Sequence, residues 1–268
     1  MRPVLFHLGE LAVPSFWVAA FLGFAAAFVL VRSEVLRHGY DREVAYDFIL
    51  AAYVGGWVGA RLFLIPTGWQ FFSEDPIGFL LASSGWVWQG GVIGGAIGVL
   101  YMARRRGVPL LVAADVCAPG LAIGLAIGRI GCQLAGDGDY GIPSALPWAM
   151  SYPDGVVPTT ERVHPTPIYE MLANLAILAY LWRHRRRGPA PGDMIGRYLV
   201  LSSVTRFLVE FVRRNPAWLV GLTTAQWMSV GFTVLGVALV RHAAGRPSGP
   251  AGPDAERDAP VAGSAAAA

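Results

Sequence analysis

Arg129 is the residue whose type and position most need a chemical explanation. It lies near the end of an apolar run, residues 110–130, at a depth where the chain would still be inside a membrane. A charge at such a position costs about 2.5–3.5 kcal/mol on insertion scales, so it usually faces a polar cavity or an anion. Two interpretations remain open. The side chain snorkels to the outer interface, or its rigid guanidinium fork binds the phosphate of a phospholipid head group.

A second charged group lies late in the chain. Arg206, Glu210 and Arg213 are spaced i, i+4 and i+7, so they share one face of a helix. One interpretation is a buried arginine–glutamate pair that fixes helix packing. The other is that Glu210 orients an arginine that also meets a substrate anion, and the two are compatible.

The segment HPTPIYE, residues 164–170, has the prolines of a helix start, with Tyr169 and Glu170 in the first turn. A lone histidine near an interface is more often a hydrogen-bonded structural residue than a catalyst, but His164 is also the best candidate for a general base. The preceding loop, residues 137–163, is rich in Gly, Pro and Asp. Ordering of this loop is the expected role of Asp137, Asp139 and Tyr140.

The two cysteines and five histidines give no metal-ligand spacing, and we expect neither a metal site nor a cofactor. Cys117 and Cys132 are 15 residues apart on one expected helix. That spacing separates them by roughly 22 Å, too far for a disulfide. Cys132 is expected to be an inert packing thiol.

The composition indicates a membrane protein. The 268 residues are 54% hydrophobic and 15% charged, with a mean hydropathy of +0.48, whereas soluble domains carry about 25% charged residues. All 21 basic residues are arginine, in clusters at the ends of apolar runs, which is typical of topology signals and argues against nucleic-acid binding. The first apolar run has no small-residue cleavage site after it, so it reads as a retained helix.

The apolar runs predict an all-α fold with seven transmembrane helices in one domain, residues 1–242. The expected spans are 14–31, 44–65, 86–102, 110–130, 167–182, 195–212 and 219–240. External loops are expected at about 66–85 and 137–163, and a disordered cytoplasmic tail at 243–268. Glycines four residues apart on the second, third and fourth spans predict close helix packing.

Arginine placement orients these spans, with the N-terminus outside and the C-terminus in the cytoplasm. Fourteen arginines fall on the inner side and seven do not, and topology leaves those seven unexplained. Five of them lie in, or just beyond, the outer halves of spans, as an anion site at the outer leaflet requires: Arg61, Arg129, Arg206, Arg213 and Arg214.

Together these residues resemble the prolipoprotein diacylglyceryl transferase family over residues 14–240. The likeness rests on five segments in order: GARL (59–62), GWVWQGGVIGG (85–95), GRIGCQLAGD (128–137), HPTPIYE (164–170) and RFLVEFVRR (206–214). The resemblance implies transfer of a diacylglyceryl group from phosphatidylglycerol to the lipobox cysteine of a preprolipoprotein, in the bacterial inner membrane. It also implies seven spans with an external N-terminus, in agreement with the arginine placement.

The resemblance implies site residues as well. Arg129 and Arg206 match the family's phosphate-handling arginines, Glu210 its neighbouring acid and Asp137 its acidic signature residue. Gln89 stands where the family often has a histidine proposed as base, and we expect it to position substrate by hydrogen bonding. The substrate-binding candidates are completed by Arg61, Gly136 and Tyr169.

Two rival functions remain open. One is a related transferase with a different acceptor or anionic lipid, which the mass of the product would reveal. The other is a non-catalytic membrane protein that binds anionic phospholipid without releasing glycerol phosphate. A transporter is disfavoured, because no inverted repeat or pair of broken helices is visible.

Overall fold

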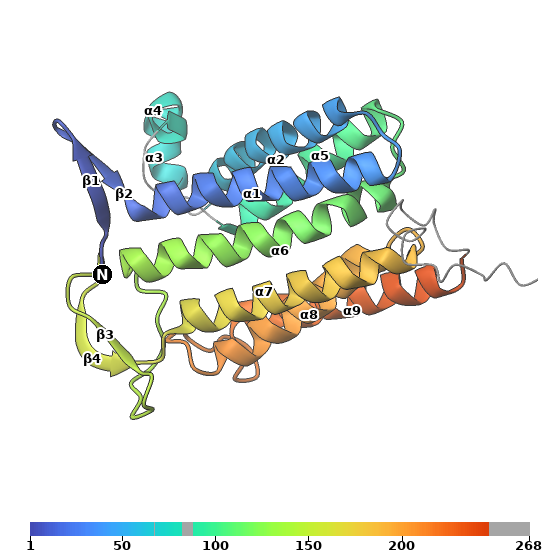
Figure 1. Cartoon of the computed structure of the whole chain (residues 1–268). Coiled ribbons are helices and arrows are strands. Elements are labelled where there is room, and N and C mark those ends of the chain that lie inside the picture. The colour runs from blue at the N-terminus through green and yellow to red at the C-terminus, as the bar shows by residue number, and fades with distance from the viewer. Residues whose placement is uncertain (67, 82–87, 247–268) are drawn as a thin grey trace, which may run out of the picture. The chain divides into compact units, whose positions relative to one another are not determined.

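The computed structural model describes residues 1–66, 68–81 and 88–246, and it is mostly helical (Figure 1). Within that range seven helices have 18 or more residues: α1 Ser15–Arg37, α2 Arg42–Leu62, α5 Trp88–Arg105, α6 Leu110–Ala135, α7 Thr166–His184, α8 Asp193–Glu210 and α9 Thr224–Ala244. The shorter elements are β1 Val4–Leu8, β2 Leu11–Pro14, α3 Trp69–Glu74, α4 Pro76–Leu81, β3 Met150–Tyr152, β4 Thr159–Val163 and the 3₁₀ turn Arg185–Arg187.

Three of these helices, α1, α6 and α9, are long and apolar enough to cross a membrane by length and composition. The other four long helices are less apolar on average; α8, for example, includes Asp193, Arg197, Arg206 and Glu210 within 18 residues. Large apolar side chains nevertheless face outward on the long helices, with Phe21 72% and Val234 65% exposed. Helices that are apolar on their outer faces are typical of membrane proteins, and the chain is one.

The chain forms two compact units, and each is described by itself. One contains Met1–Leu30 together with the chain from Cys117 onward, and the other is Val31–Val116. In the second unit α2 packs against α5 through glycine. A Cβ atom on Gly94 would lie 2.2 Å from the carbonyl oxygen of Gly55, and one on Gly59 would lie 2.3 Å from that of Gly90. The close packing expected from the glycine spacing is therefore confirmed for these two helices.

In the first unit α7 packs against α8, and α8 against α9 (Figure 1). Gly196 and Gly236 allow the second contact, because a Cβ on Gly236 would lie 2.7 Å from the carbonyl oxygen of Gly196. The seventh helix begins at Thr224, five residues later than the sequence predicts. Thr223 ends the preceding turn and forms a capping box with Gln226, which fixes the helix start there.

Two short hairpins are additions to the predicted all-helical fold. β1 pairs with β2 before the first long helix, and β3 pairs with β4 inside the segment 137–163. The second hairpin is ordered by a small core in which the Tyr140 and Tyr152 rings stack 4.8 Å apart and Val163 is fully buried. The segment 66–85 holds α3 and α4, and the predicted tail lies outside the described residues from position 247.

Candidate active site

Arg129 is held inside the first unit instead of reaching outward. Its side chain is 15% exposed and projects from α6, nearly two turns before the helix ends at Ala135. One nitrogen, Nη1, contacts the carboxylate of Asp139, and Nε lies 2.5 Å from Oε2 of Glu170. The structure therefore favours an internal charged site over a snorkelling side chain.

Glu170 lies between arginines from two different helices, Arg129 on α6 and Arg206 on α8. It is the fifth residue of α7, and its side chain is 4% exposed. One of its oxygens, Oε2, pairs with Arg129. Its other oxygen, Oε1, lies 3.4 Å from Nη1 of Arg206 and 3.9 Å from Nη1 of Arg213. Arg129 and Arg206 are thus close together through one buried carboxylate, as a shared anion site requires.

Glu210 forms the second carboxylate of the cluster and pairs with Arg206 one turn earlier on α8. The Oε2–Nη1 distance is 2.6 Å, and the side chain of Glu210 is fully buried. Its other oxygen accepts hydrogen bonds from Asn215 (2.8 Å) and Thr223 (2.7 Å), which link α8 to the start of α9. Glu210 is therefore fixed by helix packing and orients Arg206 at the same time, so both interpretations of this pair apply.

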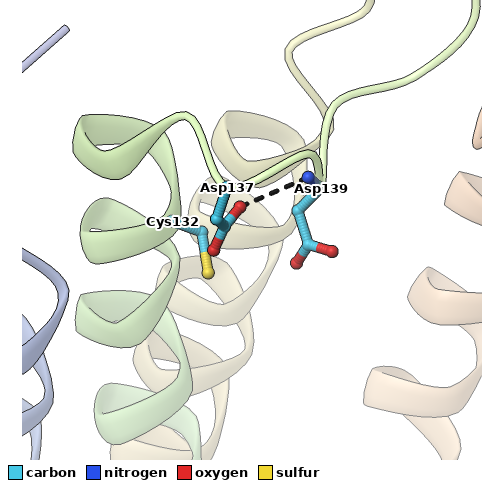
Figure 2. Close-up of side chains that lie close together, drawn as sticks. All are labelled: Cys132, Asp137 and Asp139. Carbon is cyan, nitrogen blue, oxygen red and sulfur yellow. Dashed lines mark hydrogen bonds between the residues drawn. The ribbon is translucent and has the colours of Figure 1, made fainter. Parts of the chain in front are cut away.

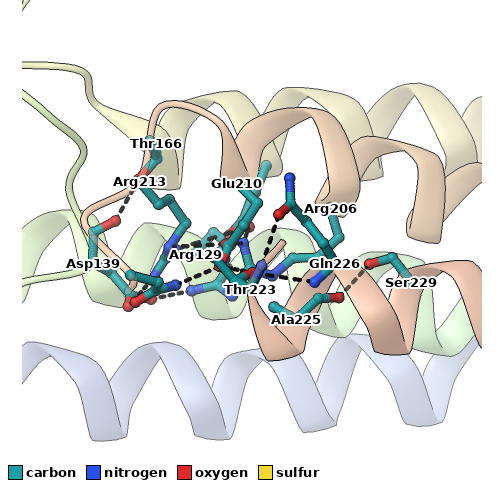
Figure 3. A network of polar contacts seen from close by, with 12 residues as sticks. Arg129, Asp139, Thr166, Arg206, Glu210, Arg213, Thr223, Ala225, Gln226 and Ser229 are labelled. Carbon is teal, nitrogen blue, oxygen red and sulfur yellow. Dashed lines mark hydrogen bonds and ion pairs between the residues drawn. The ribbon is translucent and has the colours of Figure 1, made fainter. Parts of the chain in front are cut away.

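Asp139 is the third carboxylate and lies on the loop after α6. Oδ2 accepts a hydrogen bond from Arg129 and Oδ1 accepts one from Arg213, so the side chain bridges two arginines (Figure 3). The hydroxyl of Thr166 donates to the backbone oxygen of Asp139 and anchors the loop on α7. Burial alone would raise the pKa of Asp139, but the two guanidinium groups outweigh it and hold the pKa below its ordinary value.

The cluster therefore holds three arginines and three carboxylates, whose formal charges cancel. Many of its charged atoms lie at ion-pair distance without an aligned hydrogen bond, and buried charges normally have such bonds. In the described part of the chain these atoms are Arg129 Nε, both carboxylate oxygens of Glu170, Arg206 Nη1, Glu210 Oε2 and Arg213 Nη1. The three guanidinium nitrogens among these atoms are therefore held by charge and not by aligned hydrogen bonds.

Cys132, Asp137 and Asp139 lie together at the end of α6, with ligand atoms within 4.8 Å of one another (Figure 2). The group has metal-ligand chemistry, but its electrostatic surroundings oppose a cation. Asp139 is already paired with two arginines, and Nη1 of Arg129 lies 3.7 Å from the Cys132 sulfur. We assign no metal to it, and the absence of a metal site stays a prediction. Burial raises the pKa of Asp137, and the neighbouring Asp139 carboxylate raises it further.

Gly136 has a structural reason to be glycine. Its φ is +58°, and a Cβ there would lie 2.8 Å from the Cα of Gly155 in the β3–β4 turn. The position therefore ties the loop after α6 to the second hairpin. Its predicted contact with substrate stays a prediction.

His164 and Tyr169 line an apolar cavity of about 440 Å³ together with Leu146, Trp148, Leu208, Val209 and Val212. Nδ1 of His164 lies 3.2 Å from the Tyr169 hydroxyl, which accepts a 2.8 Å hydrogen bond from Nε1 of Trp148. This network supports a structural role for the histidine. Leu208 and Val209 bring the cavity to the last turn of α8, and Val212 to the turn after it.

Two predicted residues belong to the second unit. Arg61 lies in the last turn of α2 and is 1% exposed. Gln89 lies in the first turn of α5, and its side chain is outside the described part of the structure. Their proposed contacts with substrate stay predictions.

The sequence alone assigned no substrate role to Glu170 or Asp139, although each contacts a predicted arginine. Glu170 had a usable signal, since a carboxylate within an apolar helix is nearly as costly as an arginine and needs a partner. Asp139 had none, because its contact with Arg213 joins positions 74 residues apart.

The fold and the cluster define a class: a helical membrane protein with a buried arginine–carboxylate site suited to an anionic group. A family model described as prolipoprotein diacylglyceryl transferase matches residues 3–242. The chain belongs to this family, so the resemblance is confirmed, and with it the enzyme class of transferase.

Individual relatives cover nearly the whole chain. A phosphatidylglycerol–prolipoprotein diacylglyceryl transferase of Clostridium tetani is 29% identical over 239 residues, which cover 88% of this chain and 96% of the relative. The protein of that name from Gloeobacter violaceus is 32% identical over 246 residues, covering 87% and 90% respectively. The one from Polynucleobacter asymbioticus is 30% identical over 255 residues, covering 90% and 95%.

Proposed function

We propose that this protein transfers the diacylglyceryl group of phosphatidylglycerol to the lipobox cysteine of preprolipoproteins. The observation that carries the proposal is the convergence of Arg129 and Arg206, from α6 and α8, on Glu170. Two guanidinium groups held this close bind the phosphate of the lipid. They also stabilise the negative charge that grows on it as the leaving group departs.

In this reaction the thiolate sulfur of the acceptor forms a bond to the glyceryl carbon. The bond from that carbon to the phosphate oxygen breaks, and glycerol phosphate leaves with the electron pair. A free thiol has a pKa near 8.5, so a few per cent is already ionised near neutral pH. His164 is the proposed base that accepts the proton of a thiol that is not yet ionised.

The other candidate residues hold substrate. Arg129, Arg206 and Glu210 form the phosphate site, with Asp137, Gly136 and Tyr169 along its loop and rim, and Arg61 and Gln89 as further contacts. The setting is a bacterial inner membrane with seven spans and the N-terminus outside, so the site opens to the outer leaflet. Support for this topology comes from seven long helices whose inner ends carry the arginine clusters.

The test uses purified full-length protein, phosphatidylglycerol vesicles and a lipobox peptide. Arg129→Ala is expected to lower kcat by about 10²–10³-fold, the usual cost of losing one donor to a developing negative charge. Arg104→Ala, at an exposed arginine at the end of α5, is the matched control and is expected to keep full activity. Normal turnover by Arg129→Ala would remove this arginine from the mechanism. Lipid binding without glycerol phosphate release by the native protein would instead favour a non-catalytic lipid-binding protein.

A further inference from the structure

The three carboxylates of the arginine cluster are not equivalent. Glu170 and Glu210 are 4% and 0% exposed and lie on helices, whereas the side chain of Asp139 is 31% exposed and lies on a loop. The loop passes through Gly138, whose φ is +92°. Asp139 is therefore the one of the three with both a path to water and a backbone neighbour of wide conformational freedom.

Asp139 also has the geometry of a bound anion. Each of its two oxygens takes a different arginine, Arg129 on α6 and Arg213 just beyond α8. The two free oxygens of a phosphodiester bridge a pair of guanidinium groups in the same way, and a phosphodiester carries the same single negative charge.

We propose that Asp139 is a resident anion that the lipid phosphate displaces from Arg129 and Arg213. The inference rests on the proposed function, in which Arg129 receives the phosphate of phosphatidylglycerol together with Arg206. Before the lipid phosphate can bind Arg129, it must replace the Asp139 carboxylate there. The inference also adds Arg213 to the residues that receive the phosphate.

Displacement follows from charge. With Asp139 in place the three arginines are already neutralised, so an added phosphate would meet no net positive charge and would lie against a like charge. When Asp139 swings to water, one negative charge replaces another and the cluster keeps its balance. Asp139 therefore sets the affinity for lipid and keeps the buried arginines paired between turnovers.

The experiment measures binding of phosphatidylglycerol in detergent micelles, and KM and kcat with vesicles and a lipobox peptide. Asp139→Asn is expected to lower Kd and KM for phosphatidylglycerol by roughly tenfold, the equivalent of one net charge-assisted contact, with a smaller change in kcat. Asp139→Glu is expected to restore wild-type values. Asp154→Asn, which removes the same charge from the exposed β3–β4 turn, is the matched control.

A second variant covers the case in which Asp139→Asn does not fold. Thr166→Val removes the hydroxyl that anchors the Asp139 backbone while leaving every charge in place. Like Asp139→Asn, it is expected to lower the KM for phosphatidylglycerol. Weaker or unchanged lipid binding in the folded Asp139→Asn and Thr166→Val variants would overturn the inference. If Arg129→Ala still abolished binding, the proposed function would survive that result. If Arg129→Ala bound lipid normally, the proposed phosphate site would fail as well.

Discussion

Asp137 and Asp139 are two residues apart, yet their carboxyl groups meet opposite surroundings. Asp139 faces two arginines, and its lowered pKa means that its ionised form stabilises the fold. That stabilisation is present above the unfolded carboxyl pKa of about 3.9 and is lost as the pH falls through the lower folded value. Asp137 has its pKa raised by burial and by the Asp139 charge, so its ionisation costs stability at neutral pH.

At the residue scale this contrast predicts that Asp137→Asn raises the melting temperature near neutral pH. The amide keeps an oxygen in place of Oδ1, which accepts the Asp139 N–H at 3.2 Å, and it removes the cost of a buried charge. Because the native protein holds the Asp137 proton more tightly than the unfolded chain does, the gain shrinks as the pH falls towards about 4. Thermal unfolding in detergent at several pH values measures it. An equal gain at every pH would contradict the electrostatic origin.

Only part of the arginine–carboxylate cluster could be predicted from the sequence. Arg129, Arg206 and Glu210 could be predicted because an intramembrane charge is costly and because i, i+4 spacing places two of them on one helix face. Their convergence on Glu170, and the bridge from Asp139 to Arg213, depend on tertiary packing, which no local spacing encodes.

At the element scale the helices were the most predictable part of the fold. Apolar runs mark the starts of the first six long helices to within two residues and their ends to within six. The start of α9 was misplaced because apolar residues of the preceding turn, such as Trp218 and Leu219, continue the hydrophobic run. The β3–β4 hairpin was missed because its strands have only three and five residues, too short for an alternating apolar pattern to stand out.

The glycine-lined contact between α2 and α5 predicts a large difference between two Gly→Ala substitutions. Gly94→Ala would place a Cβ 2.2 Å from the carbonyl oxygen of Gly55, which forces the helices apart and is expected to cost about 1–3 kcal/mol. Gly231→Ala on α9, where nothing lies within 4 Å, is the control and is expected to be neutral or to stabilise by about 0.5–1 kcal/mol. Thermal unfolding in the same detergent compares them. Similar stability of the two variants would mean that the α2–α5 contact is not close-packed in the folded protein.

At the scale of the whole molecule, the reaction depends on which side of the membrane the site faces. Glu170 near the start of α7 and Glu210 at the end of α8 lie at the same end of these two helices. The loop after α6 and the β3–β4 hairpin lie at that end as well. The 3₁₀ turn Arg185–Arg187 lies at the other end of α7. Arginines are retained on the cytoplasmic side, so the proposed orientation places the site outside, where exported preprolipoproteins and outer-leaflet phospholipid meet.

Cysteine accessibility tests this orientation in intact cells. In a background with Cys117 and Cys132 replaced by alanine, Asp154→Cys in the β3–β4 turn is expected to react with a membrane-impermeant maleimide added from outside. Arg186→Cys, exposed in the 3₁₀ turn, is expected to react only after the membrane is permeabilised, because the arginine-rich end of α7 faces the cytoplasm. The opposite labelling pattern would invert the topology and place the arginine cluster on the wrong side for lipoprotein modification. Labelling of both cysteines from outside would mean that α7 does not span the membrane.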